Sequence, residues 1–488
     1  MRRLLFVSVL MIFACNVLWA EEAVVTARIE QSHRDNYGVG YIFPMKERGM
    51  LFQSLCKKSD HGQRFFRTEY YDTNLNLVLV DSVLVDKNME VYNHLYENNV
   101  NYTVLREKRG EEFIVVSFDP ATHQTRVIDG EYTRKGSMRN LTIADDYMVF
   151  SSTQRKTDRI GIFNLSGGDA RFADIHFDKV RDKDIYIMEN PVIDNMVNAL
   201  VRVKEEVYLV RIDMQGNQQK PICITAAVPQ HILTASVSKA GGKYFVTGTY
   251  TDKKKNDKAQ GIYFGQLDGD YFAFIKFFNF LDLNNFTEYM SEKAQKKVER
   301  RKEKAEKQGK VYSMDYLIAS HKIIEHNGYY YYLGEAFNPT YSYVPTGRIG
   351  AMRVFDGYYY THAVLVKFDN QGNIMWDNCF EMKPRTRPFY VKLFINAGFK
   401  DGHINAMFVD NKNIVSKSFD EATGLVVSDR KAEVLETDDE AEDIKKTRSS
   451  NAQHWFGDNF LVYGDQVVKN NDTGKRRRVY FINKYTIK

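Results

Sequence analysis

One short pattern recurs along this chain at nearly regular intervals. A strand-like run ends in a large apolar residue, Asp or Asn follows at once, and a turn leads into a second strand-like run. The instances are Tyr71-Asp72, Phe118-Asp119, Phe163-Asn164, Ile212-Asp213, Leu267-Asp268, Phe368-Asp369, Phe419-Asp420 and Ile482-Asn483. Their successive spacings are 47, 45, 49, 55, 101, 51 and 63 residues. Chance hairpins in a β protein would not keep so steady a period, so we interpret the pattern as a structural repeat.

The turns within this repeat have hairpin chemistry. Residues 210–217 read VRIDMQGN and residues 366–373 read VKFDNQGN. In both, an Asp able to accept hydrogen bonds from its own turn precedes a Gly that can take a positive φ. The chain also contains 31 Tyr and 32 Phe but only 9 Pro, which is a composition typical of strands and turns.

A period in the high forties has room for four strands and their turns, which is the size of a propeller blade. Residues 313–382 show four such runs, at 316–324, 328–337, 362–369 and 373–382. The sequence therefore predicts an all-β fold, a β-propeller of four-stranded blades with eight blades favoured over seven. The double spacing before Asp369 is interpreted as one blade with two insertions, at 281–312 and 338–360. A strand around 24–30 is expected to complete the last blade and close the ring.

The first insertion contains the one strongly helical stretch. Residues 291–310 carry nine Lys/Arg and four Glu, with opposite charges three and four apart and no apolar stripe. We expect a single charged helix that projects into solvent, with a contact arm for an acidic partner as the alternative. An acidic run at 436–443 is predicted to be a linker before the last blade.

The N-terminal residues 1–20 have the features of a signal peptide. Arg2 and Arg3 precede an apolar run at 4–14, and cleavage after Ala20 would leave 21–488 as a single propeller domain. A lipobox-like reading around Cys15 is the alternative, and would give membrane association through a lipid. The remaining Cys56, Cys223 and Cys379 are odd in number and widely spaced, so they do not indicate disulfides.

A basic face is predicted from the blade topology. In a four-stranded blade, the turns between the second and third strands share one face of the disc. In register with the repeat, these turns fall at 57–61, 106–112, 155–159, 204–206, 252–258, 338–360, 410–413 and 469–478, and they hold 21 Lys/Arg against 12 Asp/Glu. Lys253, Lys254 and Lys255 stand in a row in one of these turns. Such a face concentrates anions, although Lys-rich hairpin tips chosen for solubility would look the same.

The insertion 338–360 on that face is rich in aromatic residues and guanidinium groups. Aromatic rings beside guanidinium groups suit stacking on sugar rings or planar partners. A loop packed over the disc by its own aromatics is the alternative. The candidate binding residues are Tyr341, Tyr343, Arg348, Arg353, Tyr358, Tyr359 and Tyr360, together with Lys253, Lys254 and Lys255.

No catalytic signature is present in the sequence. HExxH, GxSxG, CxxC and GxxxxGK are all missing, and residues 321–326, HKIIEH, are one residue too long for an HxxEH metal site. We therefore predict no cofactor, no metal site and no nucleic-acid partner, and we assign no catalytic residue.

Several stretches carry a family resemblance. GYYYYLGEAFNPTY, DGYYYTHAVLVKFD, NIMWDNCFEM and HWFGDNFLVYG resemble uncharacterised exported proteins of the Bacteroidetes bacteria, and DNQGNIMW is similar to the repeat unit of bacterial propellers. The resemblance implies an exported protein and brings no activity with it. Surface-secreted proteins of that phylum usually carry a separate C-terminal sorting domain. Because this chain is expected to end within its last blade, a periplasmic or outer-membrane-associated location is predicted.

Two functions remain open from the sequence. The first is a non-enzymatic binding or scaffold propeller of the cell envelope that engages an acidic envelope protein or an anionic glycan through the basic, aromatic-rich face. The alternative is a carbohydrate-active enzyme, a glycoside hydrolase or lyase, with its site at the central channel.

Overall fold

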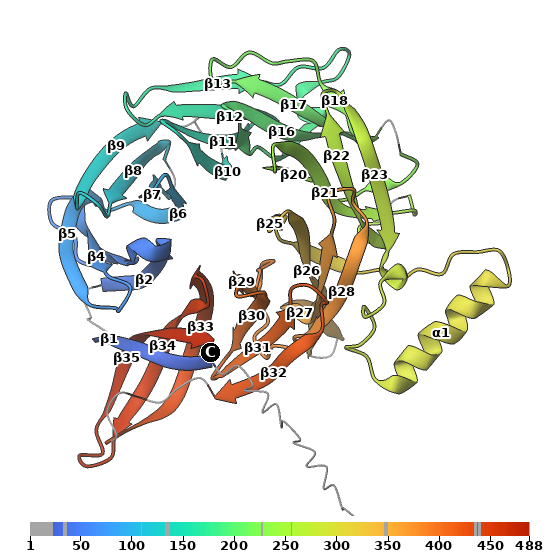
Figure 1. The fold of residues 1–488 in the computed structure, drawn as a ribbon. Coiled ribbons are helices and arrows are strands. Elements are labelled where there is room, and N and C mark those ends of the chain that lie inside the picture. The colour runs from blue at the N-terminus through green and yellow to red at the C-terminus, as the bar shows by residue number, and fades with distance from the viewer. Residues whose placement is uncertain are drawn as a thin grey trace, which may run out of the picture.

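The structure is a computed structural model that describes residues 23–32, 37–108, 110–131, 137–225, 228–254, 256–345, 350–433, 437 and 441–487. Within these residues the strands form eight antiparallel sheets around a central opening (Figure 1). Each sheet has four strands along its main path. The predicted all-β propeller is confirmed, and its blade number is eight.

The first four blades follow the chain order. Blade 1 is β2 (Tyr37–Pro44), β3 (Met50–Cys56), β4 (Gln63–Tyr71) and β5 (Leu77–Asp86), with the short helix η1 (Lys46–Arg48). Blade 2 is β6 (Met89–Glu97), β7 (Val100–Glu107), β8 (Glu112–Asp119) and β9 (Gln124–Glu131). Blade 3 is β10 (Ser137–Ala144), β11 (Tyr147–Gln154), β12 (Thr157–Asn164) and β13 (Ala170–Asp174). After η2 (Asp182–Asp184), blade 4 is β14 (Ile185–Glu189), β15 (Val192–Ile193), β16 (Met196–Val203), β17 (Glu206–Asp213) and β18 (Ile222–Cys223).

The remaining blades carry the insertions and the closure. Blade 5 is β19 (His231–Ile232), β20 (Ser236–Ala240), β21 (Lys243–Thr251), β22 (Gly261–Asp268) and β23 (Tyr271–Asn279), followed by η4 (Phe280–Asp282) and α1 (Glu292–Glu306). Blade 6 is β24 (Leu317–Ser320), β25 (Ile324–His326), β26 (Tyr329–Pro345), β27 (Ala351–Phe368) and β28 (Ile374–Glu381). Blade 7 is β29 (Asn396–Lys400), β30 (His403–Asp410), β31 (Asn413–Asp420) and β32 (Val426–Glu433). Blade 8 is β33 (Glu442–Phe456), β34 (Asn459–Asn470), β35 (Arg476–Ile487) and β1 (Ala23–Ser32).

The recurring Asp and Asn residues make the turns between third and fourth strands. The carboxylate of Asp213 accepts hydrogen bonds from the backbone amides of Gln215 (2.9 Å) and Asn217 (2.8 Å). It accepts a third, of 2.9 Å, from the side-chain amide of Asn217. These bonds, led by the one from the Asn217 side chain, lower the pKa of Asp213. Gly216 takes a φ of 93° there. The same three bonds recur at Asp72 and Asp369, so the repeat identified in the sequence is a turn held by its own carboxylate.

The hydrophobic core lies between neighbouring sheets. Between blades 6 and 7, for example, Leu333 of β26 and Phe408 of β30 belong to one buried cluster. Such inter-sheet clusters let each blade bury both faces, and together they make the disc a single packed unit.

The ring closes with the N-terminal strand, as predicted. β1 pairs antiparallel with β35 from Ala23 opposite Ile487 to Ser32 opposite Val479. Arg28 on β1 is buried and donates hydrogen bonds to Asn483 (3.0 Å) and Gln466 (3.1 Å). The indole of Trp455 in β33 donates to the carbonyl of Gly49 in blade 1 over 2.9 Å. The N-terminal strand β1 therefore completes blade 8, and Trp455 links blade 8 to blade 1.

Three details of the sequence interpretation are corrected. Asn483 is not at a turn but within β35, because the fourth strand of blade 8 comes from the other end of the chain. The strand expected at 316–324 is divided into β24 and β25, with residues 321–323 between them. The acidic run does not stay a linker throughout, since Glu442 and Asp443 begin β33, where Glu442 pairs with Arg477.

The charged insertion forms the predicted helix. α1 has no buried residue and extends away from the disc (Figure 1). The signal segment 1–20 with Cys15, and most of the acidic run, lie outside the described residues.

Candidate binding surface

Because successive strands of a blade run in opposite directions, two kinds of loop lie on the same face of the disc, and both carry insertions. The turns between second and third strands and the connections from one blade to the next all emerge there, and we call it the insertion face. The eight turns predicted to share a face are those between second and third strands. The blade-to-blade connections at 280–316 and 382–395 share that face with them.

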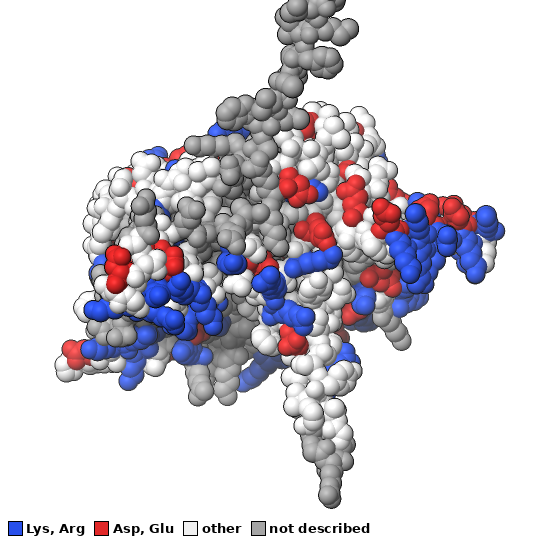
Figure 2. Space-filling model, turned by 90° about the horizontal axis from the view of Figure 1, so that it is seen from below, with Lys and Arg blue, Asp and Glu red and all other residues white. Residues whose placement is uncertain are grey.

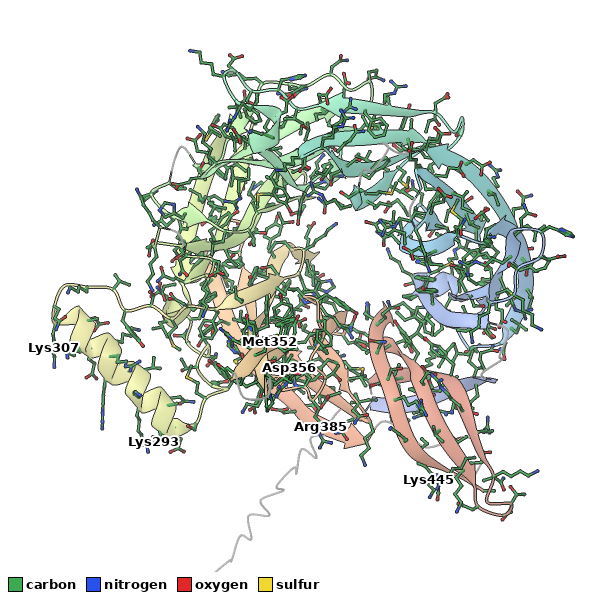
Figure 3. The ribbon with its side chains drawn as sticks, turned by 180° about the vertical axis from the view of Figure 1, so that it is seen from behind. Lys293, Lys307, Met352, Asp356, Arg385 and Lys445 are labelled. Atoms are coloured by element: carbon green, nitrogen blue, oxygen red, sulfur yellow. The ribbon has the colours of Figure 1, made fainter. Side chains whose placement is uncertain are left out.

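A long hairpin extends from blade 6 on this face. The pairing of β26 and β27 continues past the blade through Tyr341 opposite Phe355 and Tyr343 opposite Arg353 to Pro345 opposite Ala351. Figure 2 shows it as a narrow projection from the disc, and Figure 3 labels Met352 and Asp356 on it from behind. The insertion 338–360 is thus a continuation of two strands and not a separate loop lying over the disc.

The hairpin is held at its base by the connection 382–395. The Tyr358 amide donates to the Pro388 carbonyl over 2.8 Å, and Arg387 pairs with Asp356 at 2.9 Å. Gly357 has a φ of 93°, and a Cβ there would lie 2.5 Å from the Arg387 carbonyl oxygen. Only glycine allows this approach, so the bulge in β27 and the connection form one unit.

A buried carboxylate fixes the far end of the same connection. Glu335 of β26 is fully buried and accepts hydrogen bonds from the backbone amides of Phe394 and Ile395, each at 2.9 Å. His321 lies 2.8 Å from the same carboxylate. The HKIIEH segment is therefore structural, as expected from the sequence. Among the described residues no three His, Cys, Asp or Glu side chains gather as metal ligands.

Together the hairpin and the connection expose an unusual amount of aromatic and aliphatic side chain. Tyr343 is 69% exposed, Phe389 70% and Tyr390 69%, and Phe355 joins the two segments by packing edge-on against Phe389. Met352, Val344, Val391 and Leu393 are also exposed large apolar residues. We call residues 341–345, 351–359 and 385–393 the aromatic surface. Contiguous exposed apolar side chains are common at interaction sites, so this surface is the candidate site.

Cations border this surface. The guanidinium of Arg353 lies 3.5 Å from the centre of the Tyr341 ring, a cation–π contact that also keeps both side chains at the hairpin. The connection 382–395 carries four Lys/Arg and no acid. One of these, Lys392, donates to Asn451 over 2.6 Å, and burial lowers the pKa of its ammonium group. Figure 2 shows Lys and Arg side chains gathered toward the side of the disc from which the hairpin projects.

The predicted binding residues divide into three groups. Tyr341, Tyr343 and Arg353 are brought together on the exposed hairpin, with Tyr358 and Tyr359 half-buried at its base. Tyr360 is instead fully buried, and its hydroxyl donates to the Lys392 carbonyl over 2.6 Å, so it positions the connection.

The lysine group lies elsewhere. Lys253 belongs to the turn of blade 5, where it pairs with Asp315 at 2.8 Å, and Lys254 is exposed beside it. Lys255 and Arg348 lie outside the described residues.

The sequence reasoning missed the connection 382–395. Its run RPFYVKLF looks like a strand by composition, yet it follows Pro384, contains Pro388 and forms no strand in the structure. The prolines at 384 and 388 within an apolar run were the feature of the sequence that could have identified this connection. Proline has no backbone N–H to donate, so such a run does not fit in the middle of a β-sheet.

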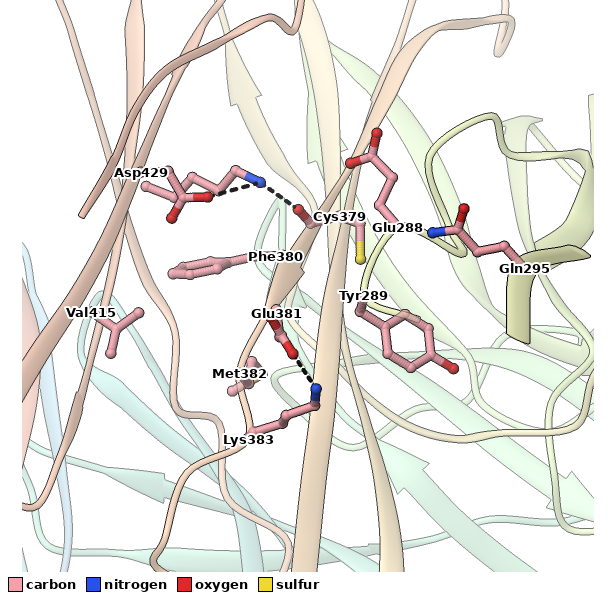
Figure 4. A pocket seen from close by; sticks show the side chains of 11 residues that line it. Glu288, Tyr289, Gln295, Cys379, Phe380, Glu381, Met382, Lys383, Val415 and Asp429 are labelled. Carbon is pink, nitrogen blue, oxygen red and sulfur yellow. Dashed lines mark hydrogen bonds and ion pairs between the residues drawn. The ribbon is translucent and has the colours of Figure 1, made fainter. Parts of the chain in front are cut away.

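A cavity of about 780 Å³ lies at the outer rim, and several ionisable side chains line it (Figure 4). It has Glu288, Glu381 and Asp429 in its lining, but Lys383 is paired with Glu381 and Lys417 lies 3.8 Å from Asp429. Burial raises the pKa of the Cys379 thiol to about 12, so the thiol is protonated at neutral pH. Two of the three lining carboxylates are therefore matched by lysines, and Cys379 is not an activated thiol nucleophile.

A second cavity, of about 380 Å³, lies at the inner strands of blades 1, 2 and 8. Its lining is aromatic, aliphatic and amide, with Tyr41, Phe43, Tyr92, His94, Tyr96 and Gln453 among its members, and contains no Asp or Glu. A glycoside hydrolase that acts through paired carboxylates would find none in this lining, which does contain His94.

The described cysteines Cys56, Cys223 and Cys379 are free, and only Cys379 is fully buried. Within the described part of the chain, no helix combines the length and the apolar character needed to cross a bilayer.

No protein-family model matches this sequence, and the comparison with curated proteins found no match. Among solved structures, a prolyl endopeptidase matches with a TM-score of 0.40 and 8% identity over 81% of this chain, which spans 50% of that protein. The β-propeller domain of the Trilobed protease from Pyrococcus furiosus matches with a TM-score of 0.36 and 9% identity, covering 80% of this chain and 98% of that one. The periplasmic gluconolactonase PpgL of Pseudomonas aeruginosa matches with a TM-score of 0.39 and 9% identity, covering 79% and 96%. These are likenesses of fold, and the activities of those proteins are not carried to this chain.

Proposed function

We propose that this propeller is a binding module that engages an anionic glycan through the aromatic surface, without catalysing a reaction. The observation that carries the proposal is the exposure of Tyr343, Phe389 and Tyr390 at 69–70% on two segments that hold each other in place. Rings presented on a fixed scaffold lose little conformational entropy when they stack on a flat partner.

The charge around the surface favours an anion as the partner. Arg353 lies over the Tyr341 ring, and Arg385 in the connection 382–395 is exposed and forms no ion pair among the described residues. Of the other cations in that connection, Arg387 and Lys383 are paired with carboxylates and Lys392 is half-buried. Of the two partners expected from the sequence, a glycan accounts for the exposed rings and the cations together, since each sugar unit offers an apolar ring face and can carry an acidic group. We place the module in the cell envelope, following the export signal expected in residues 1–20 and the resemblance to exported proteins of the Bacteroidetes.

Affinity electrophoresis through gels that contain heparin, polygalacturonate or dextran tests this function. The protein is expected to be retarded by at least one of the acidic polysaccharides and not by neutral dextran. The triple variant Tyr343→Ala, Phe389→Ala, Tyr390→Ala should lose at least tenfold in apparent affinity. Tyr271→Ala on β23, a comparably exposed tyrosine at 63%, is the matched control and should bind as the unmodified protein does.

Two results would contradict the proposal. One is an unchanged retardation of the triple variant, and the other is a lack of preference for acidic over neutral polysaccharide. Glycan cleavage by the unmodified protein would instead support the enzymatic alternative.

A further inference from the structure

A separate cavity lies on the insertion face between blades 7 and 8. Its volume is about 480 Å³, and three segments form its wall: the connection 382–395, the turn between β30 and β31, and the first part of β33. Figure 3 labels Arg385 and Lys445 on this side of the disc. The size is within the range of small-ligand sites and exceeds what a lone phosphate or sulfate fills.

The lining has one sign of charge. Arg385, Lys446 and Arg448 are exposed there, and the other lining residues are Thr, Ser and Asn, so no acid takes part. Hydroxyl and amide groups can donate to oxyanions, and guanidinium groups bind them with two parallel hydrogen bonds.

These three cations are not neutralised as their neighbours are. Close by, Arg387 pairs with Asp356, Lys445 with Asp443 and Arg478 with Asp465. Within the described part of the chain, no such ion pair is formed by the side chains of Arg385, Lys446 or Arg448. Cations held near one another without counter-charges raise the local concentration of anions.

Two acids close in sequence or pairing to the lining residues serve other groups. Buried Asp410 accepts the backbone amide of Arg385 at 2.8 Å, and Asp465 is paired with Arg478. The Ser450 hydroxyl donates to the Asn411 carbonyl and ties β33 to the turn of blade 7. The wall is therefore held by hydrogen bonds between side chains and backbone groups. The three cationic side chains take no part in these bonds and are left for a ligand.

We propose that this cavity binds a phosphate or sulfate monoester carried on a sugar ring. The inference rests on the proposed function and adds a charged subsite to it. The cavity and the aromatic surface share the connection 382–395, in which Arg385 precedes Phe389 by four residues, at most about 14 Å of extended chain. One short acidic oligosaccharide can therefore place its ester in the cavity and stack its next rings on the aromatic surface.

Titration calorimetry with the full chain tests the inference. The probes are glucose 6-phosphate, glucosamine 6-sulfate, glucose, inorganic phosphate and inorganic sulfate. The sugar monoesters are expected to bind, glucose is not, and the inorganic anions should bind at least tenfold more weakly than the esters. Lys446→Ala with Arg448→Ala should weaken monoester binding by at least tenfold, and Arg385→Ala alone should also weaken it.

Lys445→Ala is the control, because Lys445 adjoins Lys446 on the same strand but is paired with Asp443. Equal losses in the control and in Lys446→Ala, Arg448→Ala would overturn the inference. So would a failure of the unmodified protein to bind any ester, or inorganic anions binding as tightly as the esters, which would make it a site for free anions. Thermal melting of each variant confirms that it is folded.

Failure of the proposed function gives a different pattern. The triple aromatic variant keeps the cavity, so it should still bind the monoesters. If monoesters bind while the polysaccharides do not, the cavity is retained and the glycan-binding function is excluded.

Discussion

At the scale of single residues, buried polar groups decide where the candidate surface stands. Glu335 is one of these, because a carboxylate with no solvent exposure holds the amides of Phe394 and Ile395. Tyr360 is another, since its hydroxyl both donates to the Lys392 carbonyl and accepts from the Lys392 amide. The exposed rings thus depend on residues that never meet solvent.

Replacing Glu335 should release the connection 382–395. In Glu335→Ala the two amides lose their acceptor inside the protein, and we expect a loss of about 3 kcal/mol in the free energy of unfolding. Urea denaturation measures it, and hydrogen exchange should quicken at Phe394 and Ile395. Glu299→Ala, on the exposed face of α1, should change stability by less than about 0.5 kcal/mol. Unchanged exchange at the two amides would mean that the connection is held by other contacts.

His362 should make the fold sensitive to acid. It is fully buried against Tyr289, with ring centres 3.7 Å apart, and burial lowers its pKa from 6.5 to about 3. Below pH 6.5 the unfolded chain therefore binds a proton here that the folded chain does not. Its contribution is fully present above pH 6.5 and is lost as the pH falls toward 3, by up to about 1.4 kcal/mol per pH unit.

The test compares the pH dependence of unfolding between variants. In His362→Phe, the slope of the free energy of unfolding against pH should be shallower between pH 6 and 4, because this proton uptake is removed. Exposed His61→Asn should keep the original slope. Burial also lowers the pKa of His94 and His454, so part of the acid sensitivity should remain. Identical slopes for His362→Phe and the unmodified protein would show that the folded protein protonates His362 as readily as the unfolded chain.

At the scale of elements, the turns could be predicted from the sequence and the long connections could not. An Asp followed by a Gly or Asn fixes a hairpin through contacts within five residues, so the marks at Asp213 and Asp369 were visible in the sequence. Asn483 was wrongly assigned to a turn because the strand that follows β35 in the sheet is β1, whose Arg28 lies 455 residues away in the chain. The connection 382–395 is set by contacts with Glu335, Asp356 and Asp410 on three different strands, which no local pattern reports.

The closure of blade 8 depends on Arg28. Its guanidinium donates to Asn483 and Gln466, both fully buried, and pairs with Glu30. Arg28→Ala should therefore lower the free energy of unfolding by about 3 kcal/mol, because two buried acceptors lose their donor. Chemical denaturation gives the value, with exposed Thr26→Ala on the same strand as the control. Equal stability of the two variants would show that β1 contributes through its backbone pairing alone.

At the scale of the whole molecule, we expect the charged helix α1 to contribute little to the stability of the disc. α1 buries none of its residues, and Lys302 reaches the Leu281 carbonyl at 3.2 Å. Replacing residues 292–306 with a short Gly-Ser linker should leave the melting temperature within about 2 °C of the unmodified protein. A fall of 10 °C or more would mean that the helix packs on the disc in solution. The linker variant should also keep its glycan affinity within about twofold at 0.15 M salt, where charges more than about 8 Å apart are screened.

The ring itself follows from the sequence because repetition is a property of the whole chain. Seven of the eight marks fall at equivalent turns, and the shortfall of one strand in the last repeat indicated where the first strand belongs. Which turns are lengthened into the segments of the candidate surface could be inferred only in part. The hairpin was visible as an insertion, whereas the cavity between blades 7 and 8 needs three segments that are far apart in sequence.

The pairing of β1 with β35 also determines when folding can finish. Ala23 is synthesised 464 residues before its partner Ile487. At about 5–20 residues per second, the earliest strand waits roughly 25 to 90 seconds for its neighbour. Throughout that interval blade 8 is incomplete, because β35, the strand that pairs with β1, has not been made. Until β35 has been made, β1 therefore has no neighbour to pair with in the ring.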